Sequence, residues 1–599
     1  MNAVIRINPA RTSSIAITAT LLSTVLIAGA TATASGAHPE PTLAITLKPE
    51  RALSDTSRID TVGVTLRFDG IRTPAGAPLL RLPLISSNVD SVANVLNDLK
   101  ATDAQGALPL TARDVSLPEE NTRDSTSGGP SREWLAERAT KGAITVRYSL
   151  PAAATLPPRG AAPPFSFTND GGGVSAAGFV FVFLPPQDIR YHTTISWDLS
   201  RAPKGSRGVS SLGEGHVVAP EPMSQDQLRM TFFMSGLINT WPRRVPKEGF
   251  FAAWQGTPSF DASSLMAWTG ALYDRYASFF GQKAPPPYGV FLRYNPINAG
   301  GGVGLHHSFV TTFGTGDGSN VPGLKITLAH EMFHTFQPYI EEPVGLASSW
   351  FGEGLAVFYE NRLPLRFGLM TPDEFLNDLN SRAGRYYTSV MATVPNSEVA
   401  KRFWADTRIR TLPYDRGSLY FATVDDAIRK TSGGKRSLDN LMLEMLGIER
   451  GGRTLTNTDW ETLLRRELGA TAVEEFRAFL NGQMPVPPSD AFGPCFQRTT
   501  QVLRRYDVGF DPAVLAETRR IVRGLVPDSA AARAGLRNGD EIVKPVPQDQ
   551  IQGRQTEQLT LVIRRNDAVF QITYLPRGES VAAYQWERVS GVPDRSCAF

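Results

Sequence analysis

Two histidines and a glutamate stand close together near the middle of the chain, in the sequence His330-Glu331-Met332-Phe333-His334. On a helix, residues four positions apart project from the same face, so both imidazoles could bind one metal ion. The glutamate cannot share that ligation, but it can face a water molecule on the metal. The pattern is typical of zinc peptidases, in which this glutamate takes a proton from water whose pKa the metal lowers.

A third candidate ligand, Glu353, follows eighteen residues after His334, within the segment 350–354 (Trp-Phe-Gly-Glu-Gly). A carboxylate from a second helix would complete a three-ligand site and leave the fourth position for water, as a catalytic zinc requires. The alternative is a surface carboxylate in the first turn of a helix, where the helix dipole favours it. The flanking residues are apolar, so this helix start is expected to be buried, and a buried acid needs a partner.

These two segments, together with residues 414–417 (Tyr-Asp-Arg-Gly), resemble the gluzincin metallopeptidases, and most of all the glycyl aminopeptidase family. The resemblance implies that Zn2+ is bound by His330, His334 and Glu353, with Glu331 as the general base. It also implies a multidomain chain: an N-terminal β-sandwich-like domain, an α-rich thermolysin-like catalytic domain and a C-terminal PDZ-like α+β domain. The substrate would be a peptide or protein.

By the same resemblance, Tyr414 matches the position at which gluzincin aminopeptidases place a tyrosine that supports the tetrahedral intermediate. A phenol can donate a hydrogen bond to the developing oxyanion, so the role is chemically reasonable. The alternative is an aromatic residue that packs on the core at the start of a helix.

The sequence departs from the family upstream of the zinc motif. The family carries a Gly-Leu-Glu-His-like segment there, and in related aminopeptidases the acid of the equivalent segment binds the amino group of the substrate. Here the stretch is Gly304-Leu305-His306-His307-Ser308, with His306 in the place of the acid. An imidazole is a poor counterion for an ammonium group. A second metal site at the two histidines is disfavoured because neighbours on a strand point to opposite faces. We therefore expect Gly304, His306 and His307 to contribute to substrate binding. The replacement of the acid by His306 leaves selectivity for a free N-terminus open.

The sequence thus predicts a zinc-dependent metallopeptidase, with cleavage at the end or in the interior of the substrate left open. One alternative is an aminopeptidase that recognises the amino group through other residues. Another is a catalytically silent PDZ-type peptide-binding protein. The complete set of ligands and base argues against the silent protein, because an inert descendant would be expected to have lost at least one of them.

The spacing of apolar residues predicts the elements that must position these groups. They are helices at 261–280, 323–337, 348–361, 417–430 and 437–446, and a strand at 288–292. Together they indicate an α-rich catalytic domain over residues 225–487, which ends in a proline-rich stretch.

The region before the catalytic domain, residues 38–224, has short alternating or apolar runs separated by Pro, Gly, Asp and Ser. This pattern predicts a β-sandwich-like domain. The expected strands are 42–47, 62–68, 143–148 and 178–184. No constellation in this region suggests chemistry.

The last part of the chain, residues 495–599, shows a strand–helix–strand pattern, and its segment 526–543 resembles the middle of a PDZ domain. Val508, Gly509 and Phe510 are expected to form a loop whose backbone N–H groups hold the C-terminus of a peptide. The alternative is a domain that only covers one side of the peptidase.

The N-terminus predicts export. Residues 1–34 contain Arg6 and Arg11, then an apolar run, then small residues suited to cleavage, which is typical of a signal peptide; an uncleaved membrane anchor is the alternative. No later stretch approaches the ~20 apolar residues that cross a bilayer. We therefore expect a periplasmic or secreted protein with no membrane span after signal cleavage.

The two cysteines of the chain, Cys495 and Cys597, are expected to form a disulfide in that oxidising compartment, with two free thiols as the alternative. The formal net charge of +3 and the lack of a basic stripe exclude nucleic acid as a partner.

Overall fold

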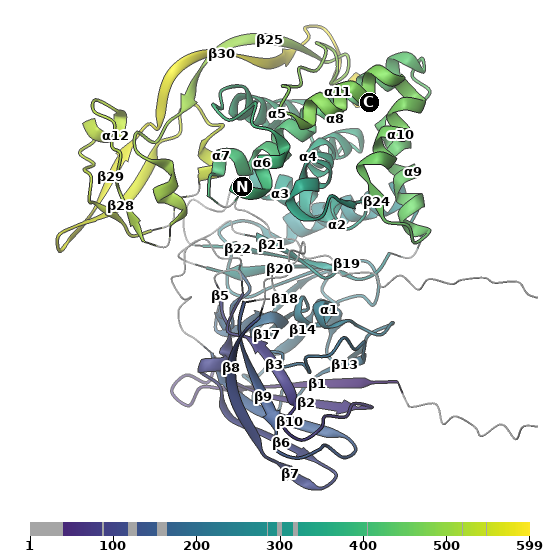
Figure 1. Ribbon diagram of the computed structural model, residues 1–599, viewed down its shortest axis with the longest axis vertical. Coiled ribbons are helices and arrows are strands. Elements are labelled where there is room, and N and C mark those ends of the chain that lie inside the picture. The colour runs from purple at the N-terminus through teal and green to yellow at the C-terminus, as the bar shows by residue number, and fades with distance from the viewer. Residues whose placement is uncertain are drawn as a thin grey trace, which may run out of the picture.

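The computed structural model describes residues 40–86, 89–117, 129–152, 164–283, 285–295, 302–314, 321–403, 405–517, 519–544, 546 and 548–598. The predicted signal peptide lies outside these residues. Among the helices that the structure describes, none has the length and apolar character needed to cross a membrane. Figure 1 shows a β-rich N-terminal part, a sheet above it, a layer of helices above that sheet, and a small C-terminal domain beside the helices.

The N-terminal part is built on a seven-stranded sheet in the order β16-β13-β1-β2-β10-β6-β7. Its strands are β1 (Thr42–Arg51), β2 (Ile59–Asp69), β6 (Asn97–Asp103), β7 (Gly106–Leu108), β10 (Ile144–Pro151), β13 (His192–Trp197) and β16 (Val217–Val218). In β1, Leu43, Ile45 and Leu47 are buried while the residues between them are not, so the alternation in the sequence marks a real two-faced strand. The predictions for 42–47, 62–68 and 143–148 are confirmed.

A second, five-stranded sheet in the order β11-β12-β17-β14-β15 lies in the same part. Its strands are β11 (Thr168–Asp170), β12 (Gly173–Ala177), β14 (Arg207–Ser210), β15 (Gly213–Glu214) and β17 (Phe232–Gly236). Shorter pairings complete the region: β3 (Pro78–Pro83), β8 (Leu110–Leu117) and β9 (Gly129–Ala136) form one sheet, and β4 (Ile85–Ser86) pairs with β5 (Val89–Asp90).

Two predictions for this part are wrong. The run 178–184 is not a strand: it begins with a 3-10 helix, Gly178–Val180, and continues as buried irregular chain. A short, fully apolar run has no periodicity that separates a strand from any other buried segment. The domain also does not end at residue 224, because β17 pairs with both β12 and β14 and extends it to Gly236. The capping box that Ser224 forms with helix α1 (Gln225–Arg229) is a helix start inside the domain, not a domain boundary.

The central sheet has the order β18-β19-β20-β22-β21. Its strands are β18 (Asn239–Trp241), β19 (Phe250–Trp254), β20 (Tyr288–Tyr294), β21 (Gly302–Leu305) and β22 (Ser308–Phe313). Both faces are covered: along β19, Phe250, Ala252 and Trp254 belong to the hydrophobic core of the helical part, whereas Phe251 and Ala253 belong to that of the N-terminal part. The two cores therefore meet through one sheet.

The α-rich part holds every helix predicted for the catalytic domain. Its helices are α2 (Ala262–Phe279), α3 (Val321–Phe333), α4 (Ser349–Arg366), α5 (Pro372–Tyr387), α6 (Asn396–Arg402), α7 (Thr407–Arg410), α8 (Leu412–Thr431), α9 (Leu438–Arg450), α10 (Asn457–Leu468) and α11 (Ala470–Leu480), with β23 (Ile340–Glu342) paired to β24 (Leu455–Thr456). Helix α8 begins five residues before the predicted start at 417, so Tyr414 lies inside the helix rather than ahead of it.

The predicted C-terminal domain, 495–599, divides into two structures. Strands β25 (Phe496–Tyr506) and β30 (Arg577–Arg588) form a long ribbon over the helices (Figure 1), and residues at its base, such as Trp586, belong to the core of the α-rich part. The compact small domain between them has its own core and a sheet in the order β26-β27-β28-β29. Its elements are β26 (Arg520–Ile521), α12 (Ala530–Arg533), β27 (Glu541–Ile542), α13 (Gln548–Ile551), β28 (Leu559–Arg565) and β29 (Ala568–Tyr574). A disulfide joins Cys495 to Cys597 and closes the base of the ribbon.

Candidate metal centre

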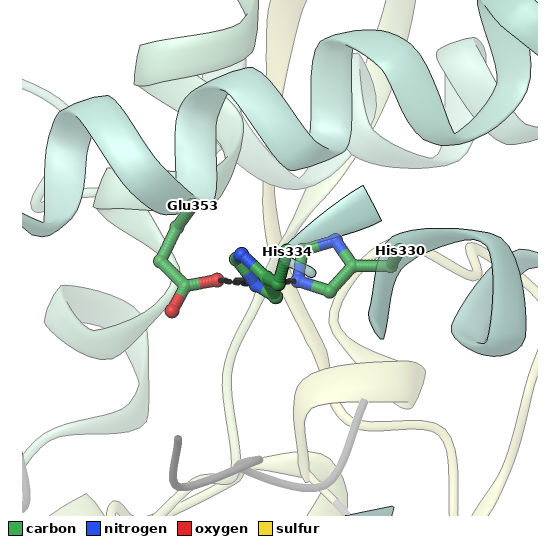
Figure 2. A group of neighbouring side chains, drawn as sticks. All are labelled: His330, His334 and Glu353. Atoms are coloured by element: carbon green, nitrogen blue, oxygen red, sulfur yellow. Dashed lines mark hydrogen bonds and ion pairs between the residues drawn. The ribbon is translucent and has the colours of Figure 1, made fainter. Parts of the chain in front are cut away.

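The side chains of His330, His334 and Glu353 converge on one point (Figure 2). His330 Nε2 lies 3.1 Å from His334 Nε2 and 3.1 Å from Glu353 Oε2, and His334 Nε2 lies 3.3 Å from the same oxygen. Zinc binds histidine nitrogen at about 2.0–2.1 Å, so ligand atoms at the corners of a tetrahedron are about 3.3 Å apart. Two imidazole nitrogens and a carboxylate oxygen at this spacing fit a zinc ion.

Two helices supply these groups. Helix α3 presents His330 and Glu331 near its end, and the turn continues to His334, whose N–H donates to the carbonyl of His330 at 3.3 Å. Helix α4 presents Glu353 in its first two turns, and the residues just before it, Trp350 and Phe351, are fully buried. The expected burial of this helix start is confirmed, and it holds Glu353 facing α3.

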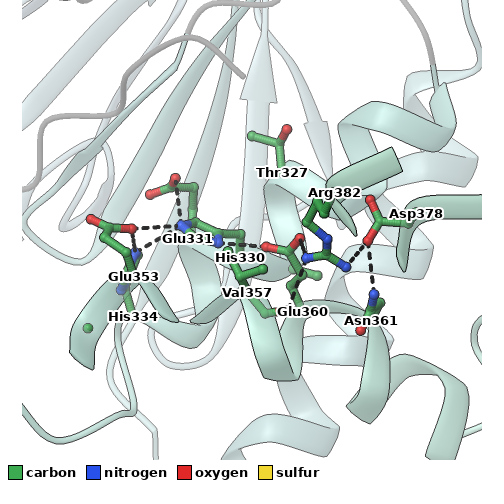
Figure 3. Close-up of polar contacts among 12 residues, drawn as sticks. Thr327, His330, Glu331, His334, Glu353, Val357, Glu360, Asn361, Asp378 and Arg382 are labelled. Carbon is green, nitrogen blue, oxygen red and sulfur yellow. Dashed lines mark hydrogen bonds and ion pairs between the residues drawn. The ribbon is translucent and has the colours of Figure 1, made fainter. Parts of the chain in front are cut away.

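A second carboxylate of α4, that of Glu360, lies at the imidazole nitrogen of His330 that faces away from the other ligands (Figure 3). Glu360 Oε2 lies 2.6 Å from His330 Nδ1, and its other oxygen accepts from Arg382 Nη1 at 2.6 Å. Arg382 is itself paired with Asp378. A histidine that donates Nδ1–H to a carboxylate is fixed in the tautomer whose Nε2 can bind metal. Glu360 was not predicted from the sequence, although its position seven residues after Glu353 places it two turns along the same helix face.

His334 is held from the other side by a tyrosine. The hydroxyl of Tyr339 donates to the carbonyl of His334 at 2.8 Å and lies 3.1 Å from Nδ1 of the same histidine, so it can accept the hydrogen bond that this nitrogen donates. Gln337 Nε2 is also 2.9 Å from that nitrogen and donates to the carbonyl of Gly352 at 3.0 Å. These contacts link the end of α3 to the start of α4.

The charges of the site favour a bound cation. Burial alone would lower the pKa of His330, but its hydrogen bonds to Glu353 and Glu360 raise it well above its usual value. Burial would raise the pKa of Glu353, yet His334 and His330 lower it well below its usual value. The carboxylate therefore stays ionised, and the imidazole holds a proton that a metal would have to displace.

Glu331 lies beside the three converging groups. Its side chain is buried, and Oε1 is 3.9 Å from His330 Nε2. The carboxylate therefore borders the point where the ligand atoms meet (Figure 3), as the role of a general base requires.

Tyr414 contacts the imidazole of His330. It sits in the first turn of α8, and its ring stacks on the imidazole with ring centroids 5.9 Å apart. Burial raises the pKa of its hydroxyl well above the usual value, and Glu353 and Glu331 raise it further. The phenol therefore keeps its proton and remains a hydrogen-bond donor at neutral pH.

Two glycines allow α4 and α8 to bring Glu353 and Tyr414 together. A Cβ atom on Gly354 would lie 2.8 Å from Gly417 Cα, and a Cβ atom on Gly417 would lie 2.6 Å from the carbonyl oxygen of Trp350. The helices thus cross backbone to backbone at a point where no larger residue fits. Gly354 of the segment 350–354 and Gly417 of the segment 414–417 make this crossing possible.

The predicted substrate-binding residues lie on and next to the edge strand of the central sheet. Gly304 is in β21, and His306 and His307 form the two-residue turn between β21 and β22. This turn faces the N-terminal part, since Ser308 Oγ, next to it, lies 3.0 Å from Ser211 Oγ. Burial, His307 and Arg190 together lower the pKa of His306 well below its usual value. The structure does not add the two histidines to the group around the metal site, and their role in substrate binding stays a prediction.

The predicted peptide-binding loop of the small domain is largely committed to its own fold. Val508 and Phe510 are buried in the core of the domain. The N–H of Gly509, one of the donors assigned to a peptide carboxylate, instead donates to Asp507 Oδ1 at 2.8 Å. The prediction that these three residues hold a peptide C-terminus finds no support in this geometry.

The architecture is similar to that of solved peptidase structures. An aminopeptidase N family protein from Idiomarina loihiensis superposes with a TM-score of 0.59 at 16% sequence identity, over 91% of this chain and 98% of that one. An M1 zinc metallopeptidase from Deinococcus radiodurans (TM-score 0.44, 15% identity, 75% of this chain and 95% of that one) is also similar. So is yeast LTA4 hydrolase in complex with bestatin (TM-score 0.41, 12% identity, 75% and 69%). No family model matches the sequence, and no curated protein matches it.

The first of these likenesses extends over nearly the whole of both chains and shows that this chain has the fold of that aminopeptidase N family protein. The fold is therefore multidomain, with a β-rich N-terminal region and an α-rich C-terminal region.

Proposed function

We propose that this protein is a zinc-dependent metallopeptidase with a gluzincin catalytic centre. The observation that carries the proposal is the convergence of His330 Nε2, His334 Nε2 and Glu353 Oε2 at separations of 3.1–3.3 Å, with Glu331 beside them. An aminopeptidase-like fold supports it.

Each residue of the site has a distinct role in hydrolysis. Zinc bound by the three ligands would supply a Lewis acid that lowers the pKa of water and polarises the substrate carbonyl. Glu331 takes the proton from the attacking water and can pass it on to the leaving amine. Tyr414, which stays protonated, donates a hydrogen bond to the oxygen of the attacked carbonyl. Glu360 and Tyr339 hold the two imidazoles in orientation.

The substrates are peptides or proteins, and the enzyme cleaves them outside the cytoplasm. The disulfide between Cys495 and Cys597 supports an oxidising compartment, and thus a periplasmic or secreted protein. β21 is an edge strand of the central sheet, and helix α3 follows the last strand of that sheet in the chain. An extended peptide can pair with such an edge. A silent peptide-binding protein is disfavoured, because the N–H of Gly509, one of the donors that its loop would use, already donates to Asp507.

The test compares the mature protein with Glu331→Gln for zinc content and for cleavage of a mixed peptide library. The wild type should hold about one zinc, as one three-ligand site predicts, and cleave peptides. The variant should hold the same amount of zinc and cleave at a rate lower by a factor of about 100 or more. His330→Ala serves as the metal-free control. Zinc in both proteins with cleavage in neither would leave a structural metal site, and equal cleavage by both would remove Glu331 from the mechanism.

A second assay separates end from internal cleavage. The same peptides with a free and with an acetylated N-terminus should be cleaved alike by an endopeptidase. An aminopeptidase would cleave only the free ones, and it would then need an acid other than the residue at position 306 to bind the amino group.

A further inference from the structure

The small C-terminal domain reaches the catalytic helices through α13. Ile551, the last residue of α13, is buried in the core of the small domain, and Asp549 lies two residues before it. Asp549 contacts α7, which leads directly into the helix that carries Tyr414; Figure 1 shows the small domain beside α7. Only 7% of the Asp549 side chain is exposed.

The carboxylate of Asp549 is fully engaged by α7. Arg410 Nη2 donates to its two oxygens at 2.9 and 2.8 Å, and the hydroxyl of Thr407 donates to one of them. Gln552 of the small domain also donates to the Thr407 hydroxyl, at 3.3 Å. A buried acid from one domain is therefore neutralised by a partly buried arginine of the other.

The same stretch of α13 is tied to the other side of Tyr414. Arg385 of α5 donates to the backbone carbonyl of Asp549 at 2.8 Å, and it forms a fork with the carboxylate of Asp415, with both bonds at 2.6 Å. Asp415 directly follows Tyr414, and Arg410 precedes Tyr414 by four residues. The contacts of Asp549 thus reach Tyr414 from both sides along the chain.

The start of α8 packs against α4 at Gly417, but no side chain of the described residues caps it. Thr411 is shared by the end of α7 and the start of α8, and its hydroxyl donates to the carbonyl of Arg408 instead of capping α8. Pro413 follows in the first turn and has no N–H to donate. A displacement of α7 therefore also displaces Tyr414, which stacks on His330.

An interface that only covered a face of the peptidase would gain more from apolar packing, since a buried ion pair contributes little net stability. Such pairs do impose one geometry on the groups they join. We propose that the small C-terminal domain is a positioning element of the active site, in which Asp549 fixes Tyr414 through Arg410 and Thr407. This inference rests on the proposed function, because it gives Tyr414 a role in hydrolysis.

The kinetic test is a double-mutant cycle between Asp549→Asn and Tyr414→Phe, with zinc content measured for each variant. In the wild-type background, Asp549→Asn should lower kcat by about 10- to 100-fold with KM and zinc content little changed, because a misplaced catalytic group acts on the chemical step. In the Tyr414→Phe background the same substitution should change kcat by less than about twofold, since its effect passes through the missing hydroxyl.

The matched control is Asn380→Ala. Asn380 joins α5 to the C-terminal ribbon through two bonds of 2.7 Å to the backbone of Trp586, at a place that does not touch α7. It should leave kcat unchanged in both backgrounds. If Asp549→Asn fails to fold, Arg410→Lys, which keeps the charge but loses the paired contacts, takes its place in the cycle. An equal loss of kcat in both backgrounds, or no loss in either, would overturn the proposal.

A measurement independent of activity keeps this inference separate from the proposed function. Amide hydrogen exchange of the segment 407–418 should be at least about tenfold faster in Asp549→Asn than in the wild type, while the segment 321–334 exchanges equally in both. Unchanged exchange over 407–418 would overturn the positioning role. If the wild type neither binds zinc nor cleaves peptides, the proposed function fails, and the exchange result still decides whether Asp549 fixes this segment.

Discussion

At the scale of single residues, one helix holds His330 from both sides. Glu353 and Glu360 are seven residues apart on α4, so two turns of helix place one carboxylate at Nε2 and the other at Nδ1 of the same imidazole. The first is a ligand candidate. The second fixes the tautomer and increases the basicity of the ring, so it acts on metal affinity without touching the metal.

Glu360→Gln should therefore weaken zinc binding. The amide can still occupy the same space, but it cannot stabilise the ring as a carboxylate does, and the expected loss of affinity is about 10- to 100-fold. Competition with a zinc chelator measures it. Asp378→Asn is the matched control, because Asp378 pairs with Arg382 and does not contact His330. An equal effect of both substitutions would show that general loosening of the network is responsible.

Zinc binding should also depend on pH near neutrality. The pKa of His330 in the metal-free protein is raised well above its usual value, with burial opposing and Glu353 and Glu360 prevailing. Zinc binds the neutral ring, so below that pKa a proton must leave, and affinity should rise with pH by up to about tenfold per unit until the pKa is passed.

Calorimetric titration of zinc at pH 7 in buffers of different ionisation enthalpy counts the protons released. We expect about one proton from His330, since Glu353 has its pKa lowered and is already ionised. A heat that is independent of the buffer would mean that His330 is neutral before the metal arrives.

The residues that the motif names could be predicted, whereas, apart from Glu360, those that support them could not. The histidine spacing follows from helix geometry, and Glu353 stands out as an acid among apolar residues. Arg382 and Tyr339 carry no such signal, because their contacts with the site depend on how α5 and the end of α3 pack. Their roles as ligand supports became visible only with the structure.

At the scale of elements, the site depends on how closely α4 and α8 approach. Gly354 and Gly417 let the two backbones meet, and Glu353 and Tyr414 project from just beside that contact. The sequence predicted both helices, yet it placed Gly417 at the start of the second one, which in fact begins at Leu412. In a sequence, a glycine that permits close packing looks the same as a glycine that ends a helix.

Gly417→Ala should lower both stability and activity. The new methyl group would sit 2.6 Å from the carbonyl oxygen of Trp350, and overpacking of this kind costs about 1–3 kcal/mol of unfolding free energy. The added distance between the helices should also lower kcat, as it moves Tyr414 away from the ligands. Thermal unfolding and peptide hydrolysis measure the two effects.

Gly447→Ala is the matched control for that substitution. Gly447 is an exposed glycine in α9, and no atom of the described residues lies within 4 Å of the added Cβ atom. Alanine there should raise stability by about 0.5–1 kcal/mol, because it favours the helix more than glycine does. A stabilising Gly417→Ala would mean that the helices can separate at no cost.

At the scale of the whole molecule, the central sheet joins two cores, and a buried charge marks the junction. Arg293 of β20 points into the N-terminal part and donates to the backbone carbonyls of Pro164, Ser166 and Ser175 at 2.9, 2.6 and 3.1 Å. Asp170 nearby accepts from the backbone N–H of Tyr294 at 2.9 Å. Each group belongs to one part and is bonded to the other.

This junction could not be predicted from sequence. The strand that carries Arg293 was expected to end at 292, and the boundary was placed before β17 because the periodicity changes there. A continuous apolar run, such as that of β19, indicates that both faces of the strand are buried, but not that the two faces belong to different cores. Pairing of β17 with β12 and β14 is a long-range contact without a local pattern in the sequence.

Asp170 should make the junction sensitive to pH. Burial raises the pKa of Asp170 to about 6, against 3.8 for an ordinary aspartate. The folded protein thus holds this proton more tightly than the unfolded chain does. The resulting stabilisation is present in full below about pH 4 and is lost as the pH rises through 6; a shift of roughly 2 units corresponds to about 3 kcal/mol. The substitution Asp170→Asn would mimic the neutral acid at every pH.

The unfolding free energy of the wild type relative to Asp170→Asn should therefore fall by about 2 kcal/mol between pH 4.5 and 7.5, because at pH 4.5 most of the unfolded chains have already lost this proton. Urea unfolding followed by tryptophan fluorescence, with the first transition compared, measures this difference. Asp69→Asn removes a half-exposed carboxylate of the same part and should follow the wild type at both pH values. Parallel curves for the wild type and Asp170→Asn would show that Asp170 is already ionised beside Arg293 at pH 4.5, so that the junction is held by a permanent ion pair and not by a proton.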